Sequence, residues 1–375
     1  MPERHAKRYR PSSASRWTVC TASALLEETL PDTTTPYAAE GTVAHALCEQ
    51  MLRGMLEGTD FPKNDCDNEM WESANKYRDF VEEELNAAKA RTPDAKLLIE
   101  HEFNLSDFAP ESFGTSDAVI VGDDVLEVID FKYGKGVRVD AEGNSQLRLY
   151  ALGTYSDLSE LYDFTVVKTV IVQPRLDHIS VEVISVEELL NWAKEVITPA
   201  VQDIERGEVE YVIGDHCRFC KAAGTCRARA EDAFQVIDKT DTKPALLSDE
   251  EIPAILDKLD NVEKWITALR QYAEDKAILE GKHWEGYKLV ESRTVRKIED
   301  QLRALQVLEK AGFSAEEVTT VKLKGIGELE KILGKPRFNE LLGTLTVKPV
   351  GAPTLVKESD KRPEYIKIEN TFKED

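Results

Sequence analysis

Two apolar runs in the first half of the chain are separated by three turn-forming residues. The runs span residues 115–121 and 125–132, and Gly122-Asp123-Asp124 lies between them. β-Branched residues are frequent in both runs, and the intervening residues suit a tight turn. The pattern therefore predicts a β-hairpin.

Charged side chains interrupt the apolar pattern of this hairpin. Because side chains alternate across a strand, Asp130 and Lys132 should share one face, where Asp117 of the first strand can meet them. Burying charged groups on a sheet costs several kcal/mol unless they are paired or bind a metal. Carboxylates that hold a divalent cation beside a lysine suit hydrolysis of a phosphodiester.

Further apolar runs complete a sheet, and amphipathic stretches supply helices around it. Strands are expected over residues 96–105, 164–175 and 178–185. Helices are expected from the breaker at 31–36 to about Gly54, over 71–90, from Ser145 onward, and from Ser185 to near Gly207. Ser185 and Glu188 form a capping box at the start of the last helix. Helices that alternate with strands predict an α/β fold, in which a mixed sheet is flanked by helices. Glu100 and Glu102 share a face of the first strand, where either could contribute to a metal site; we favour a face exposed to solvent.

The C-terminal part of the chain carries a different pattern. Residues 240–251 have the composition of a linker. Apolar residues then recur at three- and four-residue spacing, as in a coiled coil: Ile252, Ile255, Leu259, Val262, Ile266, Leu269 and Ala273. A further helix is expected over 298–311 and an extended tail after Val350. We therefore predict one domain over residues 1–236 and a mainly helical accessory region with an extended tail over 237–375.

Composition narrows the class of protein. The chain has 48 basic and 70 acidic residues and a net charge of −22, which argues against loose, nonspecific coating of DNA. A local basic groove with a bound cation remains compatible with that charge. No apolar run is long enough to span a membrane, and the N-terminal segment lacks the apolar core of a signal peptide. We expect a cytoplasmic protein with no membrane partner.

The cysteines are unevenly distributed. Three of the six, Cys217, Cys220 and Cys226, fall within ten residues of one another, beside arginine and lysine. In a reducing compartment such clustering indicates a metal rather than disulfides. The C-x2-C-x5-C spacing, completed by one distant cysteine, fits a [4Fe–4S] cluster, and a structural zinc site is the alternative.

Taken in order, the motifs G-T-S-D, I-D-F-K and Q-L-R-L-Y, with E-G-T-V-A-H ahead of them, resemble the nuclease domain of the RecB-like branch of the PD-(D/E)XK superfamily. The resemblance covers roughly the first 230 residues and implies a restriction-endonuclease-like sheet. It extends to iron–sulfur members of the branch, such as the nuclease of CRISPR adaptation and the AddB C-terminal nuclease. The length and the C-terminal extension look like a phage-encoded relative of those nucleases.

The resemblance assigns roles to individual residues. It implies that Lys132 is the catalytic lysine and that Asp117 and Asp130 are both catalytic and metal ligands, with the carbonyl of Phe131 as a further ligand. His45 is also implied as a ligand, and its imidazole favours Mn²⁺ over Mg²⁺. The family often has glutamate where Asp130 stands, so the geometry at the metal can differ here.

Other residues are assigned to the substrate and to a second metal. Gln146 and Tyr150, four apart on one helix, are implied in holding the substrate strand or positioning the lysine, and Arg148 is expected to contact phosphate. The iron–sulfur members carry one cysteine before the nuclease core and three after it, which adds Cys20 to Cys217, Cys220 and Cys226. Such a cluster would staple the N-terminal segment to the region after the core.

These observations predict a Mg²⁺- or Mn²⁺-dependent DNA nuclease, expected to be an exonuclease that acts on single-stranded or duplex ends. The resemblance places it in phage or bacterial DNA recombination, replication or repair, in the host cytoplasm if it is phage-encoded. Two alternatives remain open: a noncatalytic DNA-end-binding or scaffold protein, and a zinc-stapled regulatory protein. Two roles remain open for residues 252–273: packing on the nuclease core, or binding a recombination or replication protein or a second copy of the chain.

Overall fold

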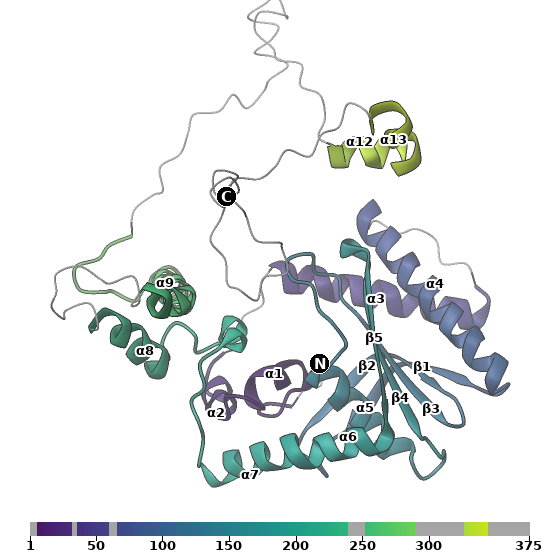
Figure 1. Cartoon of the computed structure of the whole chain (residues 1–375), viewed down its shortest axis with the longest axis horizontal. Coiled ribbons are helices and arrows are strands. Elements are labelled where there is room, and N and C mark those ends of the chain that lie inside the picture. The colour runs from purple at the N-terminus through teal and green to yellow at the C-terminus, as the bar shows by residue number, and fades with distance from the viewer. Residues whose placement is uncertain (1–5, 32–35, 60–65, 239–251, 290–325, 344–375) are drawn as a thin grey trace, which may run out of the picture. The chain divides into compact units, whose positions relative to one another are not determined.

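The computed structural model describes residues 6–31, 36–59, 66–238, 252–289 and 326–343. The chain divides into two compact units, Met1–Leu289 and Val290–Asp375, and each is described by itself. The first unit contains the sheet and most of the helices that Figure 1 labels. The functional boundary that we predict after residue 236 stays a prediction.

A five-stranded mixed sheet forms the centre of the first unit. Its strands are β1 (Lys96–Asn104), β2 (Phe113–Val121), β3 (Val125–Phe131), β4 (Val166–Gln173) and β5 (His178–Ser185). They lie in sequence order, and every neighbouring pair is antiparallel except β3 and β4. The predicted hairpin is β2–β3. The parallel pair needs a crossover, and helix α5 (Ser145–Leu158) provides it. The predicted α/β class with a mixed sheet is confirmed.

Helices lie on both faces of this sheet (Figure 1). In addition to α5, the first unit contains α1 (Ala14–Trp17), α2 (Ala22–Glu28), α3 (Pro36–Glu57), α4 (Asn68–Arg91), α6 (Val186–Trp192), α7 (Thr198–Arg206), α8 (Arg227–Asp238) and α9 (Ile252–Glu280). A single π-helical turn, Ala193–Ile197, joins α6 to α7. The predicted capping box at Ser185 and Glu188 is present, and the helical stretch ends at Gly207, where φ is 72°.

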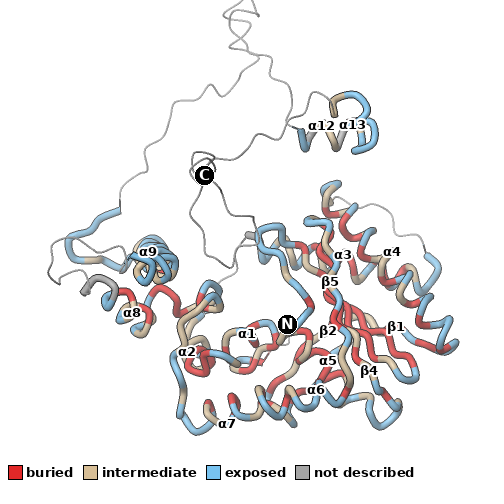
Figure 2. Tube along the Cα trace, in the orientation of Figure 1, coloured by how far each residue is buried: buried red, intermediate tan, exposed pale blue. Residues whose placement is uncertain are grey.

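The sheet separates two apolar clusters, and the alternation of side chains along β2 and β3 assigns each residue to one of them. Ala118, Ile120 and Ile129 pack with α3 and α4, whereas Val119 and Val128 pack with α5 and α6. Buried segments accordingly follow the strands and the inner sides of the helices (Figure 2). Even-numbered residues of β3 face α5, and this alternation directs Asp130 and Lys132 toward that helix.

In the second unit, the structure describes two short helices, α12 (Ile326–Leu333) and α13 (Lys335–Leu342). Gly334 joins them with a φ of 75°, a conformation that favours glycine. The helix predicted over 298–311 and the tail predicted after Val350 lie outside the described residues. None of the helices within the described ranges has the length and hydropathy required to cross a membrane.

Candidate functional site

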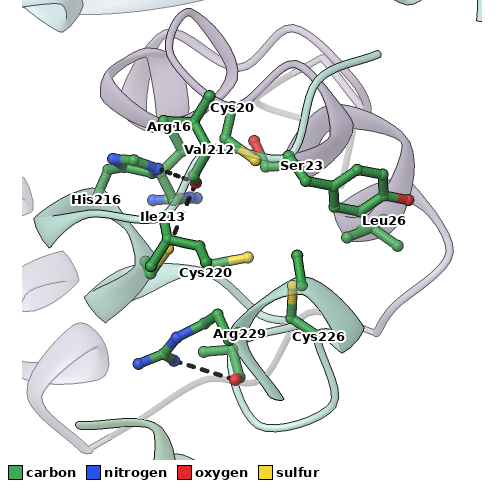
Figure 3. A pocket seen from close by; sticks show the side chains of 14 residues that line it. Arg16, Cys20, Ser23, Leu26, Val212, Ile213, His216, Cys220, Cys226 and Arg229 are labelled. Carbon is green, nitrogen blue, oxygen red and sulfur yellow. Dashed lines mark hydrogen bonds between the residues drawn. The ribbon is translucent and has the colours of Figure 1, made fainter. Parts of the chain in front are cut away.

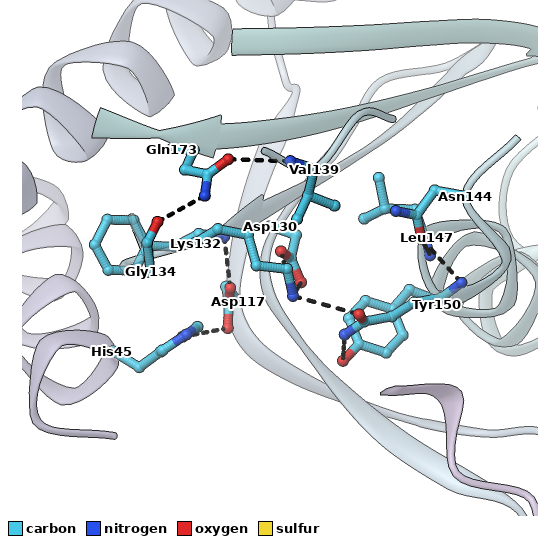
Figure 4. Close-up of polar contacts among 12 residues, drawn as sticks. His45, Asp117, Asp130, Lys132, Gly134, Val139, Asn144, Leu147, Tyr150 and Gln173 are labelled. Carbon is cyan, nitrogen blue, oxygen red and sulfur yellow. Dashed lines mark hydrogen bonds and ion pairs between the residues drawn. The ribbon is translucent and has the colours of Figure 1, made fainter. Parts of the chain in front are cut away.

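The open end of the β2–β3 hairpin brings two carboxylates together. Asp117 precedes Ala118 and Asp130 follows Ile129, and Ala118 and Ile129 are paired across the antiparallel strands. Oδ2 of Asp117 accepts a hydrogen bond from the backbone N–H of Phe131 at 2.8 Å. Figure 4 shows the two carboxylates side by side. The predicted meeting of Asp117 and Asp130 is therefore present in the structure.

Lys132 connects this pair to helix α5. Its Nζ lies 3.0 Å from Oδ2 of Asp130 and donates a hydrogen bond to Oε1 of Gln146 at 3.3 Å. Nε2 of Gln146 in turn donates to the hydroxyl oxygen of Tyr150 at 2.7 Å. A continuous polar chain thus runs from Asp130 through Lys132 and Gln146 to Tyr150 (Figure 4).

The start of α5 is fixed by its own cap. The Asn144 side chain accepts hydrogen bonds from the backbone N–H groups of Gln146 and Leu147, at 3.0 and 3.2 Å. Gln146 therefore lies in the first turn, and Tyr150 lies one turn later on the same side of the helix. Tyr150 is buried, so its ring also anchors α5 to the core. The predicted proximity of both residues to Lys132 is present, while their contact with substrate stays a prediction.

His45 reaches the same site from helix α3. Its Nδ1 lies 3.0 Å from Oδ1 of Asp117. The imidazole also meets the ring of Phe131 edge-on, with the ring centroids 5.3 Å apart. His45, predicted from an early motif, thus stands beside the carboxylates, although 72 residues separate it from Asp117.

The charges of these groups influence one another. Burial alone would raise the pKa of Asp117, but His45, the Phe131 N–H and Lys132 hold that pKa below its usual value. Burial, helped by the neighbouring Asp117 charge, raises the pKa of Asp130 above its usual value. For Lys132, burial acts to lower the pKa, but Asp130 outweighs this effect and raises it, so the amine stays protonated at neutral pH. The site therefore contains a protonated amine beside two neighbouring carboxylates whose pKa values shift in opposite directions.

The structure distinguishes Glu100 from Glu102, for both of which a surface position is favoured by the sequence. Ile99 pairs with Ala118 and His101 pairs with Ser116, so Glu100 lies opposite Asp117 on β1. Its φ of 50° is unusual for a residue other than glycine and interrupts the alternation of the strand. Glu100 is half-buried whereas Glu102 is exposed, so the expectation that both lie on one solvent-exposed face is wrong. A positive φ at glutamate leaves no signal in the sequence.

The negative charge of Glu100 affects the pKa values of buried groups on both faces of the sheet. After burial, which is the largest cause, Glu100 is among the charges that raise the pKa values of Cys48, Tyr77 and Tyr150. Cys48 and Tyr77 belong to α3 and α4, and Tyr150 belongs to α5. Glu100 therefore stands close to the site and adds a third carboxylate to its electrostatic field.

Four cysteines line a separate pocket, together with Arg16, His216 and Arg229. They are Cys20, from the turn before α2, and Cys217, Cys220 and Cys226, from the segment that leads into α8. Figure 3 shows this pocket between the N-terminal helices and that segment. The predicted convergence of Cys20 on the later three is present, and all six cysteines of the chain are free thiols. Burial raises the pKa of the Cys20 thiol and that of the Cys220 thiol, the latter to about 12.

Neither the hairpin site nor the cysteine pocket has its side chains arranged as a set of metal ligands. Among the described residues, no group of three or more histidine, cysteine, aspartate or glutamate side chains is placed so that it could hold a metal ion. At the hairpin, His45 and Lys132 occupy the positions beside the carboxylates. Binding of a metal at either site would require side-chain movement from the positions described here.

Comparison with known proteins assigns the chain to a family. A solved structure titled "Crystal structure of SSO0001" is 15% identical, covers 50% of this chain and 96% of that chain, and has a TM-score of 0.23, which is too low to carry an argument. The profile of a family described as a protein of unknown function, DUF2800, matches residues 5–363. Because that match spans most of the sequence, the chain belongs to the DUF2800 family.

Proposed function

We propose that this protein is a divalent-cation-dependent DNA nuclease of the RecB-like type, which acts on DNA ends in phage or bacterial recombination, replication or repair. The observation that carries the proposal is the meeting of Asp117, Asp130 and Lys132 at the end of one hairpin. Two carboxylates and a protonated amine in one partly buried site suit phosphodiester hydrolysis, because the substrate is an anion and the carboxylates attract a cation.

The donor set suits a hard cation, Mg²⁺ or Mn²⁺. Oδ2 of Asp130 is buried and receives no well-formed hydrogen bond from any described residue, although Lys132 Nζ lies 3.0 Å away. A metal ion could take this oxygen as a ligand once the Lys132 amine moves away from it. The carboxylates of Asp117 and Asp130, the His45 imidazole and the Phe131 carbonyl would hold the ion. When bound, it would lower the pKa of a water molecule and polarise a phosphoryl oxygen.

The amine of Lys132 supplies the positive charge at the phosphate. Because its pKa is raised, Lys132 stays protonated and stabilises negative charge, rather than acting as a general base. The Gln146 amide fixes the amine through its oxygen and is itself held by Tyr150. Gln146 and Tyr150 would thus position Lys132, and Gln146, which is half-buried rather than buried, would contact the substrate strand.

The cysteine pocket is the proposed binding site of a [4Fe–4S] cluster, with zinc as the alternative. Four thiols line it, and a cluster uses cysteine thiolates as ligands. Because burial raises the thiol pKa of Cys20 and Cys220, binding of the metal would also have to release their protons. The cluster would have a structural role, linking the segment before α2 to the segment before α8.

The test of the nuclease uses end-labelled single- and double-stranded DNA with Mg²⁺ or Mn²⁺. We expect cleavage by the wild type and a loss on the order of a hundredfold or more in Lys132→Ala and Asp130→Ala, because each removes a charge that acts on the reacting phosphate. Lys135→Ala is the matched control, since Lys135 is an exposed lysine on the same segment. Equal cleavage by wild type, Lys132→Ala and Asp130→Ala would show that the assignment of the site is wrong.

A noncatalytic DNA-end-binding role is the second candidate. It is favoured by the lack of a three-residue metal-ligand group among the described residues. In that case the wild type would bind end-labelled DNA without cutting it in either metal, and Lys132→Ala would bind equally well. Anaerobic purification addresses the cluster: a brown protein that loses iron in Cys220→Ser supports [4Fe–4S], whereas a colourless protein that contains zinc supports the alternative.

A further inference from the structure

Arg229 lines the cysteine pocket, and only 5% of its surface is exposed. It belongs to the first turn of α8, three residues after Cys226, and Figure 3 shows both residues around the same pocket. Its guanidinium donates hydrogen bonds to two backbone carbonyl oxygens, that of Ala223 at 3.1 Å and that of Asn261 at 3.4 Å. Carbonyl oxygens are uncharged, so these bonds satisfy donors but leave the positive charge of Arg229 uncompensated.

The protein groups around the pocket supply no counter-charge to Arg229. None of the described residues that line the pocket is an aspartate or a glutamate, and none of the described carboxylates forms an ion pair with Arg229. Arg16, the other arginine that lines the pocket, is different, because it donates two hydrogen bonds to the Glu27 carboxylate, at 2.7 and 2.8 Å. Of these two arginines, only Arg229 is a buried cation without an anionic partner in the described part of the chain.

A buried charge without a partner destabilises the fold, and arginine cannot relieve this by losing its proton, because it stays protonated in proteins. The side chains of this pocket that readily supply negative charge are the thiols of Cys20, Cys217, Cys220 and Cys226. They bind metals as thiolates, and four thiolates outweigh the positive charge of Zn²⁺ or of an oxidised [4Fe–4S] core. With either occupant, the loaded site would be an anion and would supply the charge that Arg229 lacks.

We propose that Arg229 is the counter-cation of the metal-loaded cysteine site. The inference rests on the proposed metal site at the four cysteines and uses no residue of the hairpin site. Arg229 is not a ligand, and it acts on the thiolates through its charge, as a residue outside the ligand set. The guanidinium and the anionic centre stabilise each other, so Arg229 strengthens metal binding.

This role predicts opposite effects of one substitution in the two forms of the protein. In the metal-free form the charge of Arg229 is unpaired, so Arg229→Met should unfold at the same temperature as the wild type or at a higher one. In the loaded form the same substitution removes the counter-charge, so the affinity for the metal should fall by about tenfold or more. A residue retained only for its two carbonyl hydrogen bonds would instead lower the stability of both forms.

The experiment compares full-length proteins purified anaerobically, with and without removal of the metal by a chelator. Metal content, loss of metal to a competing chelator, and thermal unfolding are measured on each. Arg229→Lys keeps the charge and should retain the metal nearly as well as the wild type, whereas Arg229→Met should not. Arg227→Met is the matched control, because Arg227 is exposed and directly follows Cys226, and it should match the wild type in both forms.

If the metal is iron, the reduction potential provides a further readout. Reduction adds negative charge to the cluster, so Arg229→Met should lower the potential, and a tenfold weaker preference for the reduced form corresponds to about 59 mV for one electron. Equal metal retention by wild type and Arg229→Met, or a metal-free Arg229→Met that is less stable than the metal-free wild type, would overturn the role of Arg229 and leave the metal site intact. A wild type that binds neither iron nor zinc would overturn the metal site and this role together. DNA cleavage at the hairpin enters none of these outcomes.

Discussion

The carboxylate of Asp117 is oriented by the backbone N–H of Phe131, which donates a hydrogen bond to its Oδ2 at 2.8 Å. The bond crosses from β3 to β2 and directs the other oxygen, Oδ1, toward His45. One carboxylate is thus held by a backbone group whose position cannot change without opening the hairpin. Side chains held in this way are preorganised, which is what binding of a cation requires.

The first prediction concerns the charge of Asp117. Asp117→Asn keeps an oxygen that can accept from Phe131 but removes the negative charge, so the protein should fold normally and lose DNA cleavage. We expect a loss of at least roughly a hundredfold, because disturbing even an outer partner of a metal ligand costs about 10- to 100-fold. Cleavage assays and thermal unfolding should be compared with Asp123→Asn, an exposed aspartate in the turn of the same hairpin. Full cleavage by Asp117→Asn would remove this carboxylate from the proposed mechanism.

The second prediction concerns stability and pH. Burial acts to lower the pKa of His45, but the carboxylates of Asp117 and Asp130 outweigh it, so the folded pKa lies above its ordinary value of 6.5. A folded pKa above the unfolded one stabilises the protein fully below the unfolded value, and this contribution is lost as the pH rises through the folded value. His45→Gln should therefore destabilise the protein at pH values below about 6.5 more than at alkaline pH.

Urea unfolding of both proteins at a series of pH values measures this difference. Asp117 behaves in the opposite way at acidic pH. Its pKa is lowered in the folded protein, so its contribution to stability is lost as the pH falls through that folded pKa. The difference between wild type and His45→Gln should thus be largest at mildly acidic pH. Unfolding free energies that differ by a constant amount from pH 5 to pH 9 would contradict the raised pKa of His45.

Local patterns allowed the hairpin and its charges to be predicted, because turn residues and strand alternation act over a few neighbours. They place Asp130 and Lys132 on one face without reference to the rest of the chain. His45 is different: its contact with Asp117 depends on how α3 crosses the sheet, and only the resemblance indicated it. Neither route distinguished Glu100 from Glu102, because the positive φ of Glu100 contradicts the alternation on which the prediction of a shared exposed face depends.

The third prediction tests Glu100. Because Glu100 stands opposite Asp117 and acts electrostatically on residues of three helices, it should contribute to the field that attracts a cation. Glu100→Gln is expected to raise the concentration of Mn²⁺ or Mg²⁺ needed for half-maximal cleavage, with little change in the maximal rate. Glu102→Gln, on the exposed position two residues along the same strand, provides the control. An identical metal requirement in Glu100→Gln and wild type would exclude Glu100 from the site.

The last prediction concerns Arg148, which we expected from the sequence to contact phosphate. In the structure its guanidinium forms two hydrogen bonds with the buried carboxylate of Glu182, at 3.0 and 2.6 Å, and Glu182 also accepts from the Gly143 N–H. Arg148→Met would leave that carboxylate buried without its partner, which costs about 3–5 kcal/mol in comparable cases. Arg148→Met/Glu182→Leu should recover most of this loss, because both charges are then absent.

Urea unfolding and DNA binding by fluorescence anisotropy separate the structural role of Arg148 from the predicted phosphate contact. A structural role requires that Arg148→Met be much less stable than Arg138→Met, an exposed arginine whose loss should be nearly neutral. It also requires that the double variant bind DNA as tightly as the wild type, because no phosphate contact has been removed. If instead the double variant is stable but binds DNA more weakly, Arg148 must release Glu182 when DNA arrives, and the ion pair would then be a resting arrangement of a DNA-binding residue.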